Sequence, residues 1–137
     1  MALPRGIRNN NPLNIRKGNN WKGERQHQSD PSFEEFETIQ MGLRAGFIIL
    51  RNYQRTSMAP KLRANTIRKI INRWAPASEN DTLKYIKLVA KRSGLNPDEL
   101  IAYRDKPRML AVVEAMCFVE CGQAIDKDII SSAYDLT

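Results

Sequence analysis

The chain is poor in the two side chains that most often bind metals in proteins. Its 137 residues include two cysteines and one histidine. Cys117 and Cys121 are four residues apart, which places them on one face of a helix, where a disulfide would constrain little. We interpret both as reduced thiols in the core. Because His27 is the single histidine, a site with two histidine ligands is excluded, and we predict neither a metal site nor a cofactor.

Long apolar runs are also absent. No run approaches the length that spans a bilayer, and residues 1–12 lack the apolar region of a Sec-type signal peptide. The sequence therefore predicts neither a membrane span nor a signal peptide. If the protein works outside the cytoplasm, another factor must carry it there.

Length and composition predict a single domain, residues 1–137, with 42% hydrophobic residues for its core. The net charge of +7 favours polyanionic partners, including bacterial envelope polymers. The basic residues are spread along the chain and no base-reading motif is present, so we predict no specific nucleic-acid partner. We expect a monomer.

Turn residues and helical periodicity divide the chain into two parts. Residues 13–38 hold turn formers, strand-like pieces and aromatic anchors such as Trp21, which together predict a small β-hairpin lobe. Residues 40–137 carry apolar side chains at helical spacing. The predicted helices are 42–53, 67–74 after Asn65, one from Asn80 or Asp81 to Gly94, a short one opened by Pro97, one from Pro107 to Glu120, and 129–136 after Asp126. The predicted fold is mainly α, within the α+β class.

Glu120 ends a helical stretch that is almost entirely apolar. Residues 109–119 read MLAVVEAMCFV and contain one charge, so this helix is expected to be buried on most sides. Gly122 is suited to terminate it. A carboxyl group at the end of a buried helix can retain its proton while it faces a cleft, which suits a general acid. The other carboxylate of this helix, Glu114, lies on a different face, and we expect it to pair with an Arg or Lys.

Three kinds of residue in this chain are suited to bind sugar. Asparagine side chains donate and accept hydrogen bonds, as hydroxyl and N-acetyl groups require, and Asn11 and Asn14 lie in an asparagine-rich loop. Aromatic faces such as that of Trp21 pack on pyranose rings. A carboxylic acid such as Glu120 can protonate the leaving oxygen of a glycosidic bond.

Several blocks of sequence resemble a family of small phage-encoded virion or lysis proteins, whose pattern opens with RGIRNNNPGNIR and continues with WxG, FxxF and RWAP…ENDTxxYI. The matching blocks are residues 5–16 (RGIRNNNPLNIR), 21–23 (WKG), 33–36 (FEEF), 73–76 (RWAP) and 79–86 (ENDTLKYI). Leu13 departs from the pattern, which has glycine there, and this places the local turn in question.

The same blocks resemble, more distantly, the lysozyme-like glucosaminidases and lytic transglycosylases. In that superfamily a helix ending in the catalytic Glu precedes the asparagine loop, the W-x-G hairpin, the F-x-x-Y strand and a T-D-x-x-Y segment. Here only four residues precede Arg5, whereas Glu120-Cys121-Gly122 supplies such a helix end near the C-terminus. The resemblance therefore implies a circularly permuted lysozyme-like fold, in which Glu120 is the catalytic acid.

The resemblance implies a phage-type muramidase that cleaves the MurNAc–GlcNAc bonds of bacterial peptidoglycan, by hydrolysis or by lytic transglycosylation. Glu24 and Asp30 are candidates for a second catalytic carboxylate, although each is more often a solvated charge, and transglycosylases need only one glutamate. The candidate substrate-binding residues are Asn11, Asn14, Trp21, Thr82 and Tyr85. Trp74 is expected to be a core anchor more often than a sugar platform.

The alternative is a catalytically inert virion protein that retains the fold, in contact with other virion proteins. The absence of a signal peptide fits either a virion component or a lysin that reaches the cell wall from the host cytoplasm through holin pores.

Overall fold

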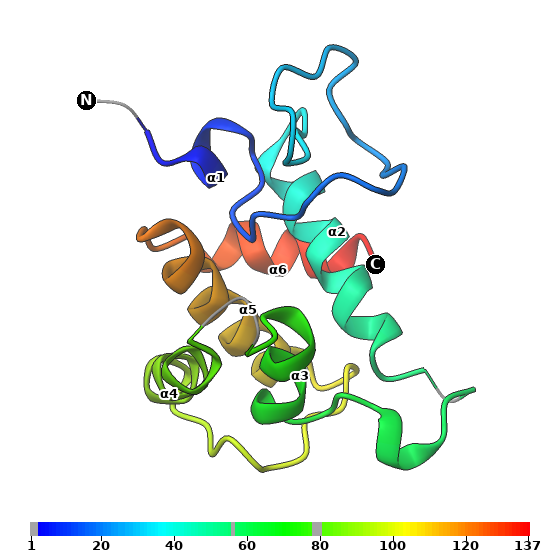
Figure 1. Ribbon diagram of the computed structural model, residues 1–137, viewed down its shortest axis with the longest axis vertical. Helices are drawn as coiled ribbons and strands as arrows, with labels where there is room; N and C mark the ends of the chain where they lie inside the picture. Colours follow the sequence, from blue (N-terminus) through cyan, green and yellow to red (C-terminus); the bar gives the residue numbers. More distant parts are fainter. Residues whose placement is uncertain (1–2, 56, 78–80) are drawn as a thin grey trace.

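The computed structural model describes residues 3–55, 57–77 and 81–137. Within these ranges the fold is mainly α, as the sequence predicts, and β structure is limited to isolated bridges. The elements are α1 (Arg5–Arg8), α2 (Ile39–Asn52), the 3-10 helix η1 (Pro60–Leu62), α3 (Ile67–Trp74), α4 (Thr82–Ser93), α5 (Lys106–Cys121) and α6 (Lys127–Asp135). Figure 1 shows α1 and the loop after it above α5, with α3 and α4 below.

Side-chain caps begin the five longer helices close to the predicted positions. The capping residues are Thr38, Thr66, Asp81, Asp105 and Asp126, each accepting a hydrogen bond from a backbone N–H of the first turn. α3 has the predicted bounds, but Thr66 rather than Asn65 is its cap. Gly94 and Gly122 end α4 and α5 in the left-handed conformation, with φ of 74° and 71°. The alternative cap Asn80 lies outside the described residues.

The short helix predicted after Asn96-Pro97 is not formed, and this segment is a turn. The side chain of Asn96 accepts a hydrogen bond from the Asp98 N–H, and that of Glu99 accepts one from the Asn96 N–H. These bonds are those of a helix start, but the groups that would continue it are engaged elsewhere: the Pro97 carbonyl accepts from the Arg68 N–H at 3.0 Å, and the Ile101 N–H donates to the Asn65 carbonyl at 2.8 Å.

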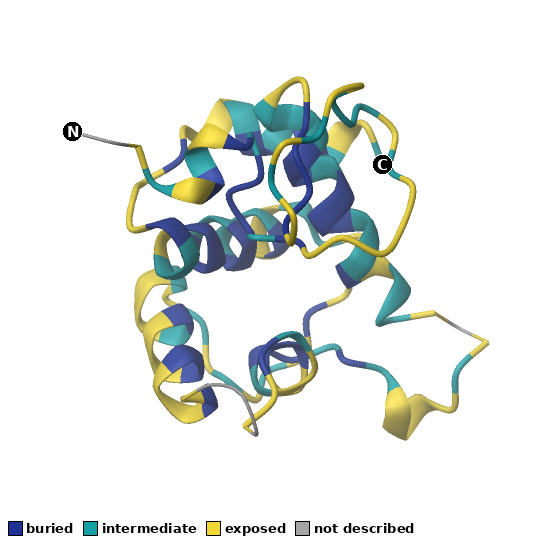
Figure 2. Cartoon of the chain, turned by 45° about the horizontal axis from the view of Figure 1, so that its top comes forward, coloured by how far each residue is buried: buried dark blue, intermediate teal, exposed yellow. Residues whose placement is uncertain are grey.

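α5 is the central helix of the core. Its buried residues are Met109, Val112, Val113, Ala115, Met116, Cys117 and Cys121, and it packs against both α4 and α6. The two cysteines are free thiols in this core, and burial raises the pKa of each. Figure 2 shows the buried residues on the inward sides of the helices and the exposed ones on the outer loops. None of the described helices is long and apolar enough to cross a membrane.

The β-hairpin lobe predicted for residues 13–38 is not formed as paired strands. The described residues contain two isolated antiparallel bridges, Arg16 with Phe33 and Glu24 with Phe36. The buried side chain of Asn11 replaces part of a ladder: its amide N–H donates to the carbonyls of Ile15 and Glu34, and its oxygen accepts from the Ile15 N–H. Asparagine side chains thus satisfy the backbone groups that strands would have paired.

This N-terminal loop lies directly on α2 because two glycines leave room for it. A Cβ on Gly42 would lie 1.9 Å from the carbonyl oxygen of Asn10, and a Cβ on Gly46 would lie 2.3 Å from Cδ1 of Leu13. Leu13, which stands where the phage pattern has glycine, is fully buried in the core. The departure therefore fills the space over Gly46 and leaves the loop in place.

Candidate active site

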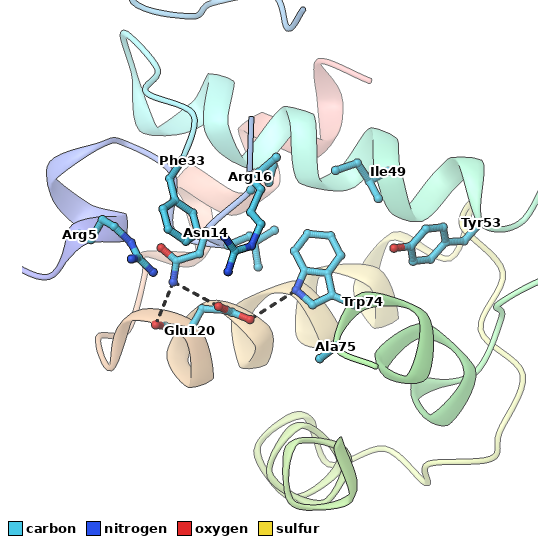
Figure 3. Close-up of a pocket in the computed structure, with 11 residues that line it drawn as sticks. Arg5, Asn14, Arg16, Phe33, Ile49, Tyr53, Trp74, Ala75 and Glu120 are labelled. Carbon is cyan, nitrogen blue, oxygen red and sulfur yellow. Dashed lines mark hydrogen bonds between the residues drawn. The ribbon is translucent and has the colours of Figure 1, made fainter. Parts of the chain in front are cut away.

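One cleft of about 900 Å³ is lined by residues from both ends and the middle of the chain. Its lining residues are Arg5, Leu13, Asn14, Ile15, Arg16, Phe33, Ile49, Tyr53, Trp74, Ala75 and Glu120. Figure 3 shows Glu120 between Phe33 and Arg5 of the N-terminal segment on one side and Trp74 of α3 on the other. The described residues of the cleft therefore include a single carboxylate.

Glu120 lies in the last turn of α5, where its half-buried carboxylate receives hydrogen bonds from three separate segments. Asn14 Nδ2 donates to Oε1 at 3.1 Å and to the Glu120 carbonyl at 3.2 Å. Tyr85 donates its hydroxyl to Oε2 at 2.9 Å, and Trp74 Nε1 lies 3.4 Å from the same oxygen. These donors fix the orientation of the carboxylate at the floor of the cleft.

Asn14 reaches Glu120 because of its backbone conformation. Its φ is 52°, in the left-handed region that asparagine tolerates better than most residues, and its N–H donates to the Asn11 carbonyl at 2.9 Å. Asn14 and Glu120, which are 106 residues apart in the chain, are therefore in direct contact. The amide oxygen of Asn14 is buried without a donor among the described residues.

Tyr85 and Thr82 lie on α4 and make different contacts. Burial and the neighbouring Glu120 charge raise the pKa of Tyr85, so its hydroxyl remains a neutral donor. Thr82 is buried and donates its hydroxyl to the carbonyl of Ala75, at the end of α3. The structure therefore brings Tyr85 to Glu120, whereas Thr82 ties α4 to the segment that carries Trp74.

The walls of the cleft combine aromatic rings with arginines. The guanidinium carbons of Arg5 and Arg16 lie 3.5 Å and 4.8 Å from the ring centre of Phe33. On the opposite wall, the ring of Tyr53 has the guanidinium carbon of Arg73 at 4.9 Å, although Arg73 itself does not line the cleft. Such pairs are stabilised by the negative face of the ring and hold the guanidinium groups in place.

Several wall residues of the cleft differ from the sequence prediction or are absent from it. Trp74 is predicted to be mainly a core anchor, but it is half-buried, contacts Glu120 and lines the cleft. The sequence analysis predicts no role for Arg5, Arg16 or Tyr53. The arginines lie within the RGIRNNNPLNIR block, which was a signal for a site, but their position over Phe33 depends on long-range packing.

Of the five predicted substrate-binding residues, Asn14 lines the cleft, and Asn11 and Trp21, like Thr82 and Tyr85, lie outside its lining. Asn11 is buried and its amide is engaged with backbone groups of the loop. Trp21 packs against the core, and its indole N–H is buried without an acceptor among the described residues. Both residues therefore shape the loop that carries Asn14.

The two candidates for a second catalytic carboxylate are also outside the cleft lining. Asp30 closes a turn: its carboxylate accepts hydrogen bonds from the backbone of Ser32 and Phe33 and from the side chain of Asn9, which together lower its pKa to about 2. Glu24 accepts from the Trp21 N–H at 3.1 Å. The structure brings neither carboxylate to Glu120.

Glu24 instead lies beside a buried partner, Glu34. Burial raises the pKa of Glu34 to about 7, and the hydrogen bond that protonated Glu34 donates to Glu24 and the charge of Glu24 contribute to the increase, while Lys17 opposes it. This pair is a feature of the N-terminal loop, separate from the cleft.

Fold and site together define a mainly α protein whose cleft is built around one glutamate. No family model matches the chain. Among curated proteins, it is similar to Protein P5 of Pseudoalteromonas phage PM2, with 44% identity over 122 residues that cover 86% of this chain and 71% of the phage protein. The chain belongs to the family of this phage protein, whose name states no activity.

Proposed function

We propose that this protein is a phage muramidase that cleaves the MurNAc–GlcNAc bonds of peptidoglycan with Glu120 as its acid and base. The observation that carries the proposal is the hydrogen bond between Asn14 Nδ2 and Glu120 Oε1 at 3.1 Å, made within an open cleft. It joins the asparagine loop to the end of the glutamate helix, which are the two parts that the resemblance places together.

The proposal includes a circularly permuted lysozyme-like fold. In the superfamily that the sequence resembles, the glutamate helix directly precedes the asparagine loop. Here α5 and the loop after α1 lie side by side although they come from opposite ends of the chain. A permutation changes connectivity while it preserves packing, and such changes are tolerated when chain ends lie at the surface.

The two oxygens of Glu120 receive different numbers of hydrogen bonds, which supports different roles for them. Tyr85 and Trp74 both donate to Oε2, whereas Oε1 receives one donor, from Asn14. Oε1 therefore retains room to hold the proton that is donated to the glycosidic oxygen. As the bond to the leaving sugar breaks, that proton moves to the leaving oxygen and Glu120 becomes a carboxylate.

Lytic transglycosylation fits the cleft better than hydrolysis with two carboxylates. Glu24 and Asp30 lie elsewhere, so no second carboxylate of the described residues lines the cleft. In the lytic reaction the 6-hydroxyl of the muramyl sugar attacks its own C1, Glu120 takes the hydroxyl proton, and a 1,6-anhydro ring forms. The aromatic wall residue Trp74 is suited to pack on the sugar rings.

Glu120→Gln tests the proposal in an assay of purified sacculi. The variant keeps the shape of the side chain but cannot transfer a proton, so we expect the rate of solubilisation to fall by at least about 100-fold. Glu114→Gln is the control on the same helix, because Glu114 pairs with Arg92 at 2.9 Å, away from the cleft. We expect that variant to retain the rate of the wild type. Equal activity of Glu120→Gln and wild type would contradict the proposal.

The second candidate is an inert virion protein. The same three hydrogen bonds to Glu120 support it, because they connect the N-terminal loop, α3 and α4 to α5 and would stabilise a scaffold without any reaction. The phage relative is compatible with this candidate. A wild-type protein that is folded but inert on sacculi from several hosts, with Glu120→Gln lowering its Tm, would favour it.

A further inference from the structure

The positive charge of this chain is concentrated in its middle. Residues 38–78 contain eight Lys and Arg and no Asp or Glu. The remaining 14 basic residues are balanced by all 15 acidic ones, so the middle segment accounts for the entire net charge of +7. Sequence reasoning treated the basic residues as spread along the chain and missed this segregation. A single-sign surface of this kind attracts polyanions.

Much of this charge lines two neighbouring concavities, of about 700 Å³ and 380 Å³. The first is lined by Arg51, Arg55, Arg63 and Arg104, and the second by Lys61, Arg63, Lys69 and Arg73. The two share Arg63, and no acidic residue of the described chain lines either one. They lie around the segment between α2 and α3, at the lower right of Figure 1, and share no lining residue with the Glu120 cleft.

Two of these guanidinium groups are held by neutral acceptors. Arg55 donates to the Asn52 side chain at 3.1 Å, and Arg73 donates to the Leu62 carbonyl at 2.6 Å. Neutral acceptors orient an arginine without cancelling its charge. The surface is therefore preorganised for an anion, and the planar fork of arginine matches the oxygens of a phosphate group.

We propose that this arginine surface binds the phosphodiester backbone of nucleic acid without reading its sequence. Two adjoining cationic concavities suit a polymer in which phosphates repeat. The aromatic rings nearby are already covered, since Arg73 lies over Tyr53 and Tyr103 stacks on Tyr134, so no ring is open for base stacking. Leu62 is the one large exposed apolar side chain of the two linings, which is little for insertion into a lipid surface.

The test is the salt dependence of binding to a short DNA duplex of arbitrary sequence, measured by fluorescence anisotropy. We expect log K to fall linearly with log salt, and the triple variant Arg55→Gln/Arg63→Gln/Arg104→Gln to reduce the slope by about 2 to 3, since each phosphate contact contributes about 0.9. Its affinity at about 50 mM salt is expected to fall by roughly 100-fold. Different duplex sequences are expected to bind equally.

The matched control removes the same charge from α4. Lys84, Lys87 and Lys91 are exposed on that helix and outside both concavities. Their triple replacement by Gln is expected to change the slope by less than about 1. If the arginine triple variant fails to fold, the double variant of the exposed Arg55 and Arg104 replaces it, with an expected slope change of about 2.

Three results would overturn the proposal: equal losses in the two triple variants, no binding of wild type at about 50 mM salt, or binding to phosphatidylglycerol vesicles without binding to DNA. The proposal is independent of catalysis, and Glu120→Gln is expected to bind DNA as wild type does. A loss of activity on sacculi would therefore contradict the proposed catalysis alone, and an absence of DNA binding would contradict the proposed nucleic-acid surface alone.

Discussion

At the scale of single residues, the side chains around Glu120 have distinct positioning roles. Tyr85 is buried and donates to Oε2, while Asn14 donates to Oε1 from a strained backbone conformation that asparagine tolerates. Thr82 and Asn11, which sequence reasoning placed at the substrate, hold backbone segments instead. The residue types that suit sugar binding also suit the construction of loops, and composition alone does not separate the two uses.

Tyr85→Phe tests the positioning role. Removing the hydroxyl takes one donor from Oε2, and a hydrogen bond to a charged group contributes about 1.5–3 kcal/mol, so the rate on sacculi is expected to fall by about 10-fold or more. Tyr103→Phe is the matched control, because its hydroxyl bonds to Thr137, away from the cleft. Equal rates for both variants would show that Tyr85 does not position Glu120.

Glu34→Gln tests the acid pair of the N-terminal loop. The folded protein holds the pKa of Glu34 at about 7, above its ordinary value of 4.5, so it binds a proton more tightly than the unfolded chain does. The free energy of unfolding of wild type is therefore expected to fall as pH rises from 4.5 to 7 and to level off above 7, relative to the Gln variant.

Urea denaturation of wild type and Glu34→Gln across this pH range measures the difference directly. We expect the Gln variant to gain stability relative to wild type with increasing pH, because it has no carboxyl to ionise next to Glu24. A constant difference between pH 4.5 and 8 would contradict the account of this pair.

At the scale of elements, caps and terminators are read from sequence more reliably than loops. The helices follow the predicted bounds closely because their signals, such as Asp81, Pro107 and Gly122, act within one turn of the chain. The structure of the loop of residues 13–38 is not predicted by such local signals. Its strand-like pieces are held by asparagine side chains and by contact with α2, and these are long-range interactions.

Gly42→Ala tests the contact of this loop with α2. A Cβ at Gly42 would lie 1.9 Å from the Asn10 carbonyl oxygen, which is backbone and cannot rotate away. We expect a loss of about 2 kcal/mol in the free energy of unfolding, although alanine favours the helix by about 1 kcal/mol.

Gly46→Ala is the comparison on the same helix face. Its Cβ would meet the side chain of Leu13, which can shift, so a smaller loss of about 1 kcal/mol is expected, and Leu13→Ala is expected to relieve it. Thermal denaturation of the three variants gives the order of effects. Gly42→Ala as stable as wild type would mean that the loop does not rest on α2.

At the scale of the whole molecule, segments distant in sequence meet in two places. Asn14 and Glu120 meet in the cleft, and the sequence indicated this meeting through the order of its motifs. The arginine surface combines basic residues from Arg51 to Arg73 with Arg104, and sequence patterns do not predict this arrangement because the loop at Arg104 joins it through tertiary packing. Motif order can predict a site, whereas a charged surface must be seen in three dimensions.

The masses of the muropeptides released from sacculi test whether Glu120 acts as the single catalytic carboxylate. Wild type is expected to release fragments with 1,6-anhydro-muramyl ends, whereas Glu120→Gln is expected to release none above background and Glu114→Gln to match wild type. Release of fragments with reducing muramyl ends would contradict the lytic mechanism, and release by Glu120→Gln at the wild-type rate would contradict the assignment of Glu120.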